Sequence, residues 1–222
     1  MKNIITAAIL LVVQMSIGQV QKNIGDFTSV QVFDRISLEL VQADENRIVI
    51  TGSRANDVEV INKNGDLHIR MKLKKLLQGE DISATLFYKT IQSIDAGEGS
   101  QLASRKPIKQ ATVDISAKEG AEIRLVLEVD KATVKAVTGG IVNLSGTADF
   151  QDVSIGTGGV VKARRFITNQ TNISMNAGGE AEIFANKIVD AKIRAGGDIK
   201  VYGNPKIEEK IVLGGTVTKV SE

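Results

Sequence analysis

The chain contains no cysteine and no tryptophan, and it has only one histidine and two prolines. Without cysteine it forms no disulfide, so its stability has to come from an apolar core and from backbone hydrogen bonds. A metal site uses several histidine, cysteine or carboxylate ligands, so we interpret the single histidine, His68, as a surface residue of a strand. Two tyrosines and six phenylalanines also leave few rings on which sugars or bases could stack.

Positive and negative charges are nearly equal in number. The 28 basic and 26 acidic residues give a formal net charge of +2, and no basic block exceeds a few residues. This balance offers no support for nucleic acid binding. A hydrophobic content of 42% and a charged content of 24% are those of a folded globular chain, and the length suits one domain.

The only long apolar run lies at the N-terminus, and residues 1–18 have the pattern of a secretory signal peptide. Lys2 precedes an apolar stretch from Ile4 to Val13, and Ser16 and Gly18 are small residues at the positions that a signal peptidase requires. We therefore expect cleavage after Gly18 and export to the periplasm or the outer cell surface. A membrane anchor is the alternative, but the apolar run is short for a bilayer. No transmembrane segment is expected after cleavage.

The most regular feature of the sequence is a ladder of glycines. The steps along it are 18 to 21 residues long, from Gly99 through Gly120 to the last pair. A fixed period of this length is typical of a solenoid. The five Gly-Gly pairs of the ladder are Gly139-Gly140, Gly158-Gly159, Gly178-Gly179, Gly196-Gly197 and Gly214-Gly215.

Between the glycines, apolar and polar residues alternate. Ile193 and Ala195, then Ile199 and Val201, are expected to point inward, with the charged residues between them in water. This pattern predicts an all-β fold, a parallel β-helix with about 18 to 21 residues per rung and glycine at the corners, where positive φ or close backbone approach is needed. A chain of antiparallel hairpins forming a sandwich or barrel is the alternative.

The part before the ladder is predicted as an N-terminal region of strands and a hairpin. Residues 19–29 are polar and are expected to form a lead-in, and the ladder takes over at Ile94. The Asn64-Gly65 pair predicts a β-hairpin turn. The predicted strands are Phe33 to Leu40, Arg47 to Gly52, Val58 to Val60, Leu67 to Met71 and Ala84 to Tyr88.

The order of these features resembles one known family. It consists of the signal peptide, Phe33-Asp34-Arg35-Ile36, the strand ending in Val49-Ile50-Thr51-Gly52, the hairpin Asn64-Gly65-Asp66-Leu67-His68-Ile69, and glycine corners every 20 residues or so. The chain is similar over residues 30–217 to the putative auto-transporter adhesin, head GIN domain family of Gram-negative bacteria. The resemblance implies a right-handed β-helical domain of an exported cell-envelope protein. It implies no catalytic residue.

Several groups of residues could form sites, and each also has a plain structural interpretation. Acidic pairs on one strand face could cleave a glycoside, but amphipathic strands carry such pairs on their solvent side anyway. The glycine corners lack the following helix that a phosphate site needs. The basic clusters Lys72-Leu73-Lys74-Lys75 and Arg164-Arg165 could meet anionic glycan or lipid headgroups, or simply be solvated. The acidic pairs are Asp95/Glu98, Asp114/Glu119, Asp149/Asp152 and Glu180/Glu182, and two glycosylation sequons start at Asn143 and Asn172.

The sequence therefore predicts an exported, non-enzymatic, adhesin-like domain that offers a β-helical surface to a glycan, an envelope component or a protein. We expect no catalytic residue, cofactor or metal. The alternatives are a structural protein that forms homo-oligomers through the ends of the helix, and an enzyme that processes polysaccharide.

Overall fold

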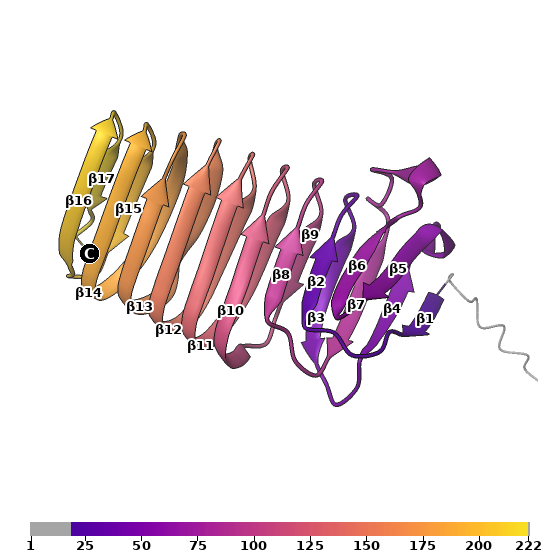
Figure 1. The fold of residues 1–222 in the computed structure, drawn as a ribbon. Helices are drawn as coiled ribbons and strands as arrows, with labels where there is room; N and C mark the ends of the chain where they lie inside the picture. Colours follow the sequence, from indigo (N-terminus) through magenta and orange to yellow (C-terminus); the bar gives the residue numbers. More distant parts are fainter. Residues whose placement is uncertain (1–18, 222) are drawn as a thin grey trace, which may run out of the picture.

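The computed structural model describes residues 19–221, so the predicted signal peptide and its cleavage site lie outside the described residues. The described chain is a β-solenoid of about seven turns, with two short 3-10 segments (Figure 1). The strands before the long turns are β1 (Gln19–Asn23), β2 (Ser29–Val32), β3 (Ser37–Gln42), β4 (Arg47–Thr51), β5 (Val58–Lys63), β6 (Asp66–Met71), β7 (Ser83–Tyr88), β8 (Ser93–Ala96) and β9 (Gln101–Ser104). They are followed by β10 (Ile108–Ala117), β11 (Glu122–Val137), β12 (Ile141–Gly156), β13 (Gly159–Met175), β14 (Gly179–Ala195), β15 (Asp198–Tyr202), β16 (Lys206–Leu213) and β17 (Thr216–Lys219); the 3-10 segments are η1 (Ala55–Asp57) and η2 (Leu73–Lys75).

The strands enclose the core from two sides. The hairpin side contains β5, β6, β2, β8, the final parts of β10 to β14, and β16. The other side, called the groove side because its outer surface is hollowed, contains β1, β4, β7, β3, β9, the first parts of β11 to β14, β15 and β17. The two sides are joined because each long strand runs around one corner of its turn.

The side chains inside the solenoid form ladders along its axis, with one residue from each turn. One ladder on the groove side runs through the buried residues Ile123, Val142, Val161, Ala181 and Ile199, with steps of 19, 19, 20 and 18 residues. All strand pairs from β8 to β17 are parallel. The predicted parallel β-helix is confirmed, and the antiparallel alternative is wrong for this part of the chain.

The two glycines of a corner pair meet different physical demands. Thr157 and Gly158 both have positive φ, 48° and 71°, as in a tight turn, and Gly158 has open space around it. Gly159 needs no positive φ, but a Cβ there would lie 2.1 Å from the backbone oxygen of Ala136 in the preceding turn. In this pair the first glycine is therefore selected by its backbone conformation and the second by close packing between turns. Gly179, Gly197 and Gly215 combine the close packing with a positive φ.

The opposite corner of each turn contains no glycine pair. In β11, Asp130 and Lys131 are both exposed, whereas Val129 and Ala132 on either side of them are buried. Two successive exposed residues shift the alternation by one residue, and the strand passes there from the groove side to the hairpin side. This break in the alternation is a local signal in the sequence from which the corner could be predicted.

The N-terminal region differs from the expectation in two places. Residues 19–29, expected as a lead-in, include β1, which pairs antiparallel with β4. The predicted strand from Phe33 begins only at Ser37, because Asp34 and Arg35 adopt positive φ of 60° and 63° in the turn that carries the chain from β2 to β3. The Asn64-Gly65 hairpin is confirmed as the connection between the antiparallel strands β5 and β6.

The last described turn ends the inward ladders with charged residues. On the hairpin side, Glu209 occupies the position that the buried residues Ile173 and Ala191 occupy in the two preceding turns. On the groove side, Lys219 follows the buried Val201 in the same way. Two hydrophobic ladders therefore finish with one acidic and one basic side chain.

Candidate functional site

The outer surface of the groove side carries a shallow basic groove. It has a volume of about 570 Å³ and crosses the turns from β9 to β14. With turns about 4.8 Å apart, four steps give it a length of about 19 Å along the solenoid axis. Its charged and amide side chains are Arg124, Asn143, Lys162, Arg164, Arg165 and Glu182.

A second hollow continues the basic groove toward the N-terminal end. It lies over β3, β7, β9 and the start of β11, has a volume of about 230 Å³, and shares Arg124 with the first hollow. An ion pair between Arg105 and Glu39, 3.0 Å from Nε to Oε1, lies at this second hollow. The two hollows therefore form one extended depression along the groove side.

A β-bulge in β13 places two arginines side by side in the basic groove. Asn143 and Ser145, two residues apart on β12, pair with Lys162 and Arg165, which are three residues apart on β13. The extra residue leaves both Arg164 and Arg165 exposed while Ala163 and Phe166 on either side stay in the core. Bulges are typically found where a strand has to redirect a side chain, and this one gathers positive charge.

Hydrogen bonds orient the polar residues on one wall of the groove. The Oε1 atom of Glu122 accepts a hydrogen bond from Nε of Arg124 at 2.9 Å and another from Nδ2 of Asn143 at 2.9 Å. These residues come from the successive strands β11 and β12 and share the outer face of the sheet. Arg124 is thereby held in place, with its charge partly balanced by Glu122.

The positive charge of the groove exceeds its negative charge. Four basic side chains line it against one acidic side chain, Glu182, which forms a 3.6 Å ion pair with Lys200. Glu122 adds a second carboxylate where the groove meets the adjoining hollow. Among residues 19–221, no ion pair or hydrogen bond engages the side chains of Lys162 and Arg165. The guanidinium of Arg164 lies 4.5 Å from the ring centroid of the nearly buried Tyr202.

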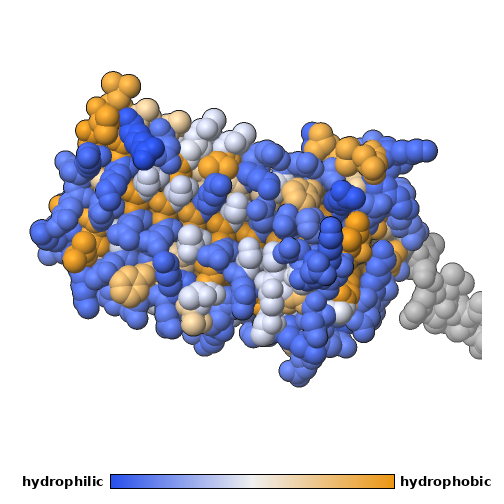
Figure 2. Space-filling model, viewed as in Figure 1, coloured by the Kyte–Doolittle hydropathy of each residue, from blue (hydrophilic) through white to orange (hydrophobic). Residues whose placement is uncertain are grey.

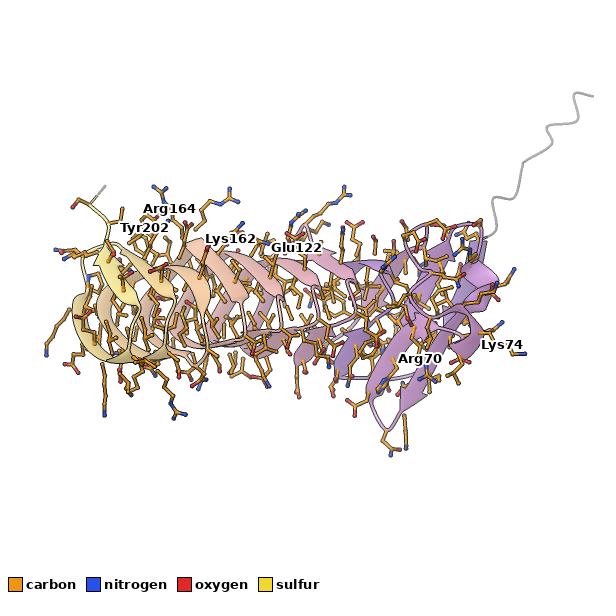
Figure 3. All side chains as sticks on the ribbon, turned by 90° about the horizontal axis from the view of Figure 1, so that it is seen from above. Arg70, Lys74, Glu122, Lys162, Arg164 and Tyr202 are labelled. Carbon is orange, nitrogen blue, oxygen red and sulfur yellow. The ribbon has the colours of Figure 1, made fainter. Side chains whose placement is uncertain are left out.

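The residues of the basic groove lie along one edge of the molecule when the solenoid is seen from above. Figure 3 shows Glu122, Lys162, Arg164 and Tyr202 along the same edge of the solenoid, whereas Lys74 lies at the far N-terminal end. The arrangement can hold an extended anion by charge and by hydrogen bonds from arginine, lysine and asparagine. The sequence indicates this site only through Arg164-Arg165, because Arg124 and Lys162 come close to them only through the register of β11, β12 and β13.

The acidic pairs weighed in the sequence are not brought together as one cluster. Asp95 lies 3.4 Å from the amine of Lys118 on the hairpin side. Asp152 on the same side pairs with Lys131 at 2.6 Å, and this contact holds the pKa of the Asp152 carboxyl below its usual range. Glu180 and Glu182 do share the outer face of β14, and Glu182 is the one that lines the basic groove.

The remaining candidate residues are spread over both sides and the N-terminal end of the solenoid. His68 faces outward from β6 and stacks on Phe33, with 6.4 Å between the ring centroids. Asn172 donates a hydrogen bond to Asp152 at 2.8 Å on the hairpin side, whereas Asn143, the other sequon asparagine, lines the basic groove. The Lys72–Lys75 cluster forms part of a loop at the N-terminal end of the solenoid.

The turn at Asp34 contains a pair of neighbouring carboxyls. Asp34 is buried and its side chain accepts hydrogen bonds from the backbone nitrogens of Met71 and Leu77, at 2.9 and 2.7 Å. Partial burial, followed by the nearby charge of Asp34, raises the pKa of the Glu98 carboxyl. Since the folded state then binds a proton more tightly than the unfolded chain, ionisation of Glu98 lowers stability as pH rises above about 4.5, the ordinary value for this group.

No group of three or more histidine, cysteine or acidic side chains within residues 19–221 is arranged to hold a metal ion. In the same residues no helix has the length and apolar character needed to cross a bilayer.

The fold and this surface define an all-β solenoid domain with an extended basic groove. Over residues 26–205 the chain matches the family model described as "Putative auto-transporter adhesin, head GIN domain". The match covers most of the chain, so the protein belongs to this family, as the order of its sequence features predicted. None of the curated proteins compared with the chain matches it.

Solved structures share the fold at low sequence identity. A crystal structure of a putative adhesin from Bacteroides fragilis NCTC 9343 is 20% identical, with a TM-score of 0.83 and coverage of 91% of this chain and 96% of that one. A putative adhesin from Parabacteroides distasonis ATCC 8503 is 19% identical, with a TM-score of 0.76 and the same coverages. A protein from the same P. distasonis strain described as a putative lipid binding protein is 17% identical, with a TM-score of 0.70, and again 91% and 96% of the two chains are covered.

Proposed function

We propose that this protein is an exported, non-catalytic, adhesin-like binding domain whose ligand is an acidic glycan. The observation that carries the proposal is the basic groove, in which Lys162 and Arg165 have no anionic partner within residues 19–221. Family membership supports an adhesin-like role.

The shape of the groove favours a linear polyanion over a flat surface. It is a shallow trough, about 19 Å long by the spacing of its turns, and its basic residues follow the solenoid axis. An extended acidic polysaccharide can lie along such a trough and present several carboxylates or sulfates to successive turns. A bilayer surface would contact only the rims.

The groove carboxylates support binding rather than glycoside cleavage. Glu122 accepts hydrogen bonds from Arg124 and Asn143, and Glu182 is ion-paired with Lys200. Glycoside cleavage needs two carboxyl groups that face the scissile bond from defined positions, whereas both of these carboxylates already contact basic side chains of the protein itself. Glu122 and Glu182 therefore fit a role in orienting the basic side chains Arg124 and Lys200.

The direct test is retention of the chain from Gln19 onward on an array of neutral and acidic glycans. We expect saturable binding to uronate-bearing or sulfated glycans and none to neutral ones. Replacing Lys162→Gln together with Arg165→Gln should weaken binding by at least about 10-fold, because two charge-assisted contacts are lost. No turnover of the bound glycan is expected.

A matched control removes the same amount of charge from the opposite side. Lys135 and Arg194 are exposed residues of the hairpin side, in β11 and β14. The variant Lys135→Gln/Arg194→Gln should bind acidic glycans like the wild type. Equal losses in both variants would show that binding depends only on net charge, and a blank array would refute the glycan ligand.

A further inference from the structure

A loop at the N-terminal end of the solenoid exposes three leucines among lysines. The basic loop, residues 72–77, has the sequence Lys-Leu-Lys-Lys-Leu-Leu and includes η2. Leu73, Leu76 and Leu77 are 77%, 47% and 46% exposed. The loop protrudes from the end of the solenoid in Figure 1, and Figure 2 shows hydrophobic surface in the same region, bordered by hydrophilic surface.

The two ends of the basic loop are fixed by one buried carboxylate. Asp34, only 1% exposed, accepts hydrogen bonds from the backbone nitrogen of Met71 just before the loop and from that of Leu77 at its end. The backbone oxygen of Asp34 accepts a third hydrogen bond from the nitrogen of Gly79 at 3.0 Å. Leu77 is held there with a positive φ of 58°, a conformation that leucine rarely adopts.

Side-chain contacts fix the foot of the loop further. The amine of Lys72 donates a hydrogen bond to the backbone oxygen of Asn56 at 2.8 Å and lies 3.6 Å from a carboxylate oxygen of Asp57. The guanidinium of Arg54 donates to the backbone oxygen of Gln78 at 2.9 Å. The leucines are therefore presented to solvent by a pinned loop and do not fold back onto the core.

The charges around the leucines select the chemistry of the partner. Lys74 and Lys75 have no ion pair or hydrogen bond to their side chains within residues 19–221. Leucines that enter the boundary between headgroups and acyl chains, next to lysines that reach anionic headgroups, are typical of peripheral membrane binding. A symmetric contact with a second copy would instead set Lys74 and Lys75 against the same residues of that copy.

We propose that the basic loop docks this domain onto a lipid surface that carries anionic headgroups. Leu73, Leu76 and Leu77 supply the apolar contact, and Lys74 and Lys75 supply the attraction to the headgroups. The loop lies at the end of the solenoid away from Arg164 and Tyr202 (Figure 3). The domain can therefore rest on a membrane by its end while its basic groove stays accessible. This proposal does not depend on the glycan ligand.

The test measures vesicle binding of the chain from Gln19 onward, which contains every described strand. Omitting the apolar residues 1–18 removes their own affinity for lipid. Flotation with phosphatidylcholine vesicles is compared with flotation after addition of about 30% phosphatidylglycerol, which gives the surface a negative potential. We expect binding only to the anionic vesicles, weakened by added salt because the lysine contribution is screened.

Two loop variants separate the two contributions. Lys74→Gln/Lys75→Gln should weaken binding by on the order of 20-fold, since each basic residue near an anionic surface contributes several-fold to affinity. Leu73→Ser/Leu76→Ser should weaken it by at least about 10-fold through lost apolar contact. All four side chains are exposed, so circular dichroism and melting should match the wild type.

The control variants carry the same changes at the other end or on a corner. Val212→Ser/Leu213→Ser removes two apolar side chains that are 68% and 71% exposed in β16, and Lys187→Gln/Lys210→Gln removes two exposed lysines. Both controls should bind vesicles like the wild type. Equal losses in controls and loop variants would overturn the proposal, as would absence of vesicle binding. Concentration-dependent dimers that only the leucine variant abolishes, with vesicle binding unchanged, would assign the loop to a second copy instead.

The vesicle and glycan experiments fail independently. The groove variant Lys162→Gln/Arg165→Gln should retain vesicle binding, and the loop variants should retain glycan binding. Loss of both activities in a single variant that is still folded would contradict the separation of the two surfaces.

Discussion

At the N-terminal end of the solenoid, β4 and β5 run antiparallel to the strands they cover, whereas at the C-terminal end β16 and β17 continue the parallel stack. Ile48 and Ile50 of the antiparallel strand β4 are fully buried at the N-terminal end, and β1 pairs with the outer edge of β4. The last turn instead leaves Val212 and Leu213 largely exposed. Hydrophobic surface is visible near both ends in Figure 2.

The difference shows two ways to finish a repeating core. A free strand edge is a template for pairing with another chain. The N-terminal end covers its core with additional strands and a loop pinned by Asp34. The last described turn breaks its inward ladders with Glu209 and Lys219, and inward-pointing charge is a known means of blocking edge-to-edge association. This arrangement weighs against assembly of copies through that end.

The largest effect on stability is expected when the second glycine of one corner pair is compared with the first glycine of another. Gly159→Ala would place a Cβ 2.1 Å from the backbone oxygen of Ala136, so the turns would have to separate. We expect a loss of about 3 kcal/mol or more in the free energy of unfolding. Gly214→Ala in the last turn meets no atom within 4 Å, and only its positive φ of 63° is costly, so the expected loss is about 1 kcal/mol.

Urea unfolding of both variants measures this difference. If Gly214→Ala were as costly as Gly159→Ala, the backbone conformation of the corners, rather than the close approach of neighbouring turns, would be the reason for the glycines.

A smaller loss of stability is expected from replacing Asp34, which holds the basic loop at the N-terminal end. Asp34→Ala leaves the buried backbone nitrogen of Met71 and the partly buried one of Leu77 without their acceptor, so we expect a loss of about 2 to 3 kcal/mol. Hydrogen exchange at the Leu77 amide should accelerate. The matched change near the other end is Asp198→Ala, which removes an exposed acceptor of the Thr216 hydroxyl at 2.5 Å and should cost less than about 1 kcal/mol.

Equal stabilities of the two aspartate variants would mean that the basic loop is held by its side-chain contacts at Arg54 and Lys72, without a major contribution from the carboxylate.

The smallest change in stability is expected when the inward-facing charges of the last turn are replaced. This replacement should instead change how copies of the chain associate. Glu209→Val/Lys219→Val continues the two apolar ladders to the exposed end. We expect concentration-dependent association in analytical ultracentrifugation, because the edge then offers apolar surface together with unpaired backbone groups. The control Glu208→Val/Lys210→Val changes outward residues of β16 and should sediment like the wild type. Association of the control to the same extent would mean that inward orientation is unimportant.

Much of the solenoid could be predicted, because its signals are local and repeated. Gly158-Gly159 and its equivalents predicted the corners, and the alternation of Ile193 and Ile199 with charged residues predicted which face is buried. The Asn64-Gly65 turn predicted the β5–β6 hairpin. Each of these features depends on residues that are adjacent in the chain, so no knowledge of the neighbouring turns was needed.

The missed features depend on contacts between distant residues. The strand predicted from Phe33 was too long because Asp34 takes a left-handed conformation to reach the nitrogens of Met71 and Leu77. The pairing of β1 with β4 has no signal in the polar residues 19–29. The Arg164-Arg165 pair was visible, but its meaning required the bulge and the neighbouring turns.

The sequence alone was sufficient for the class of fold and its repeat, because every turn of a solenoid has the same local sequence pattern and the glycines mark where the chain must bend. The tertiary structure was needed for the basic groove, because the register of β11, β12 and β13 sets Arg124, Asn143 and Lys162 side by side although they are 19 residues apart. It was needed also for the exposed basic loop, since that loop is held by Asp34, which is more than forty residues before Leu77, and by contacts of Arg54 and Lys72.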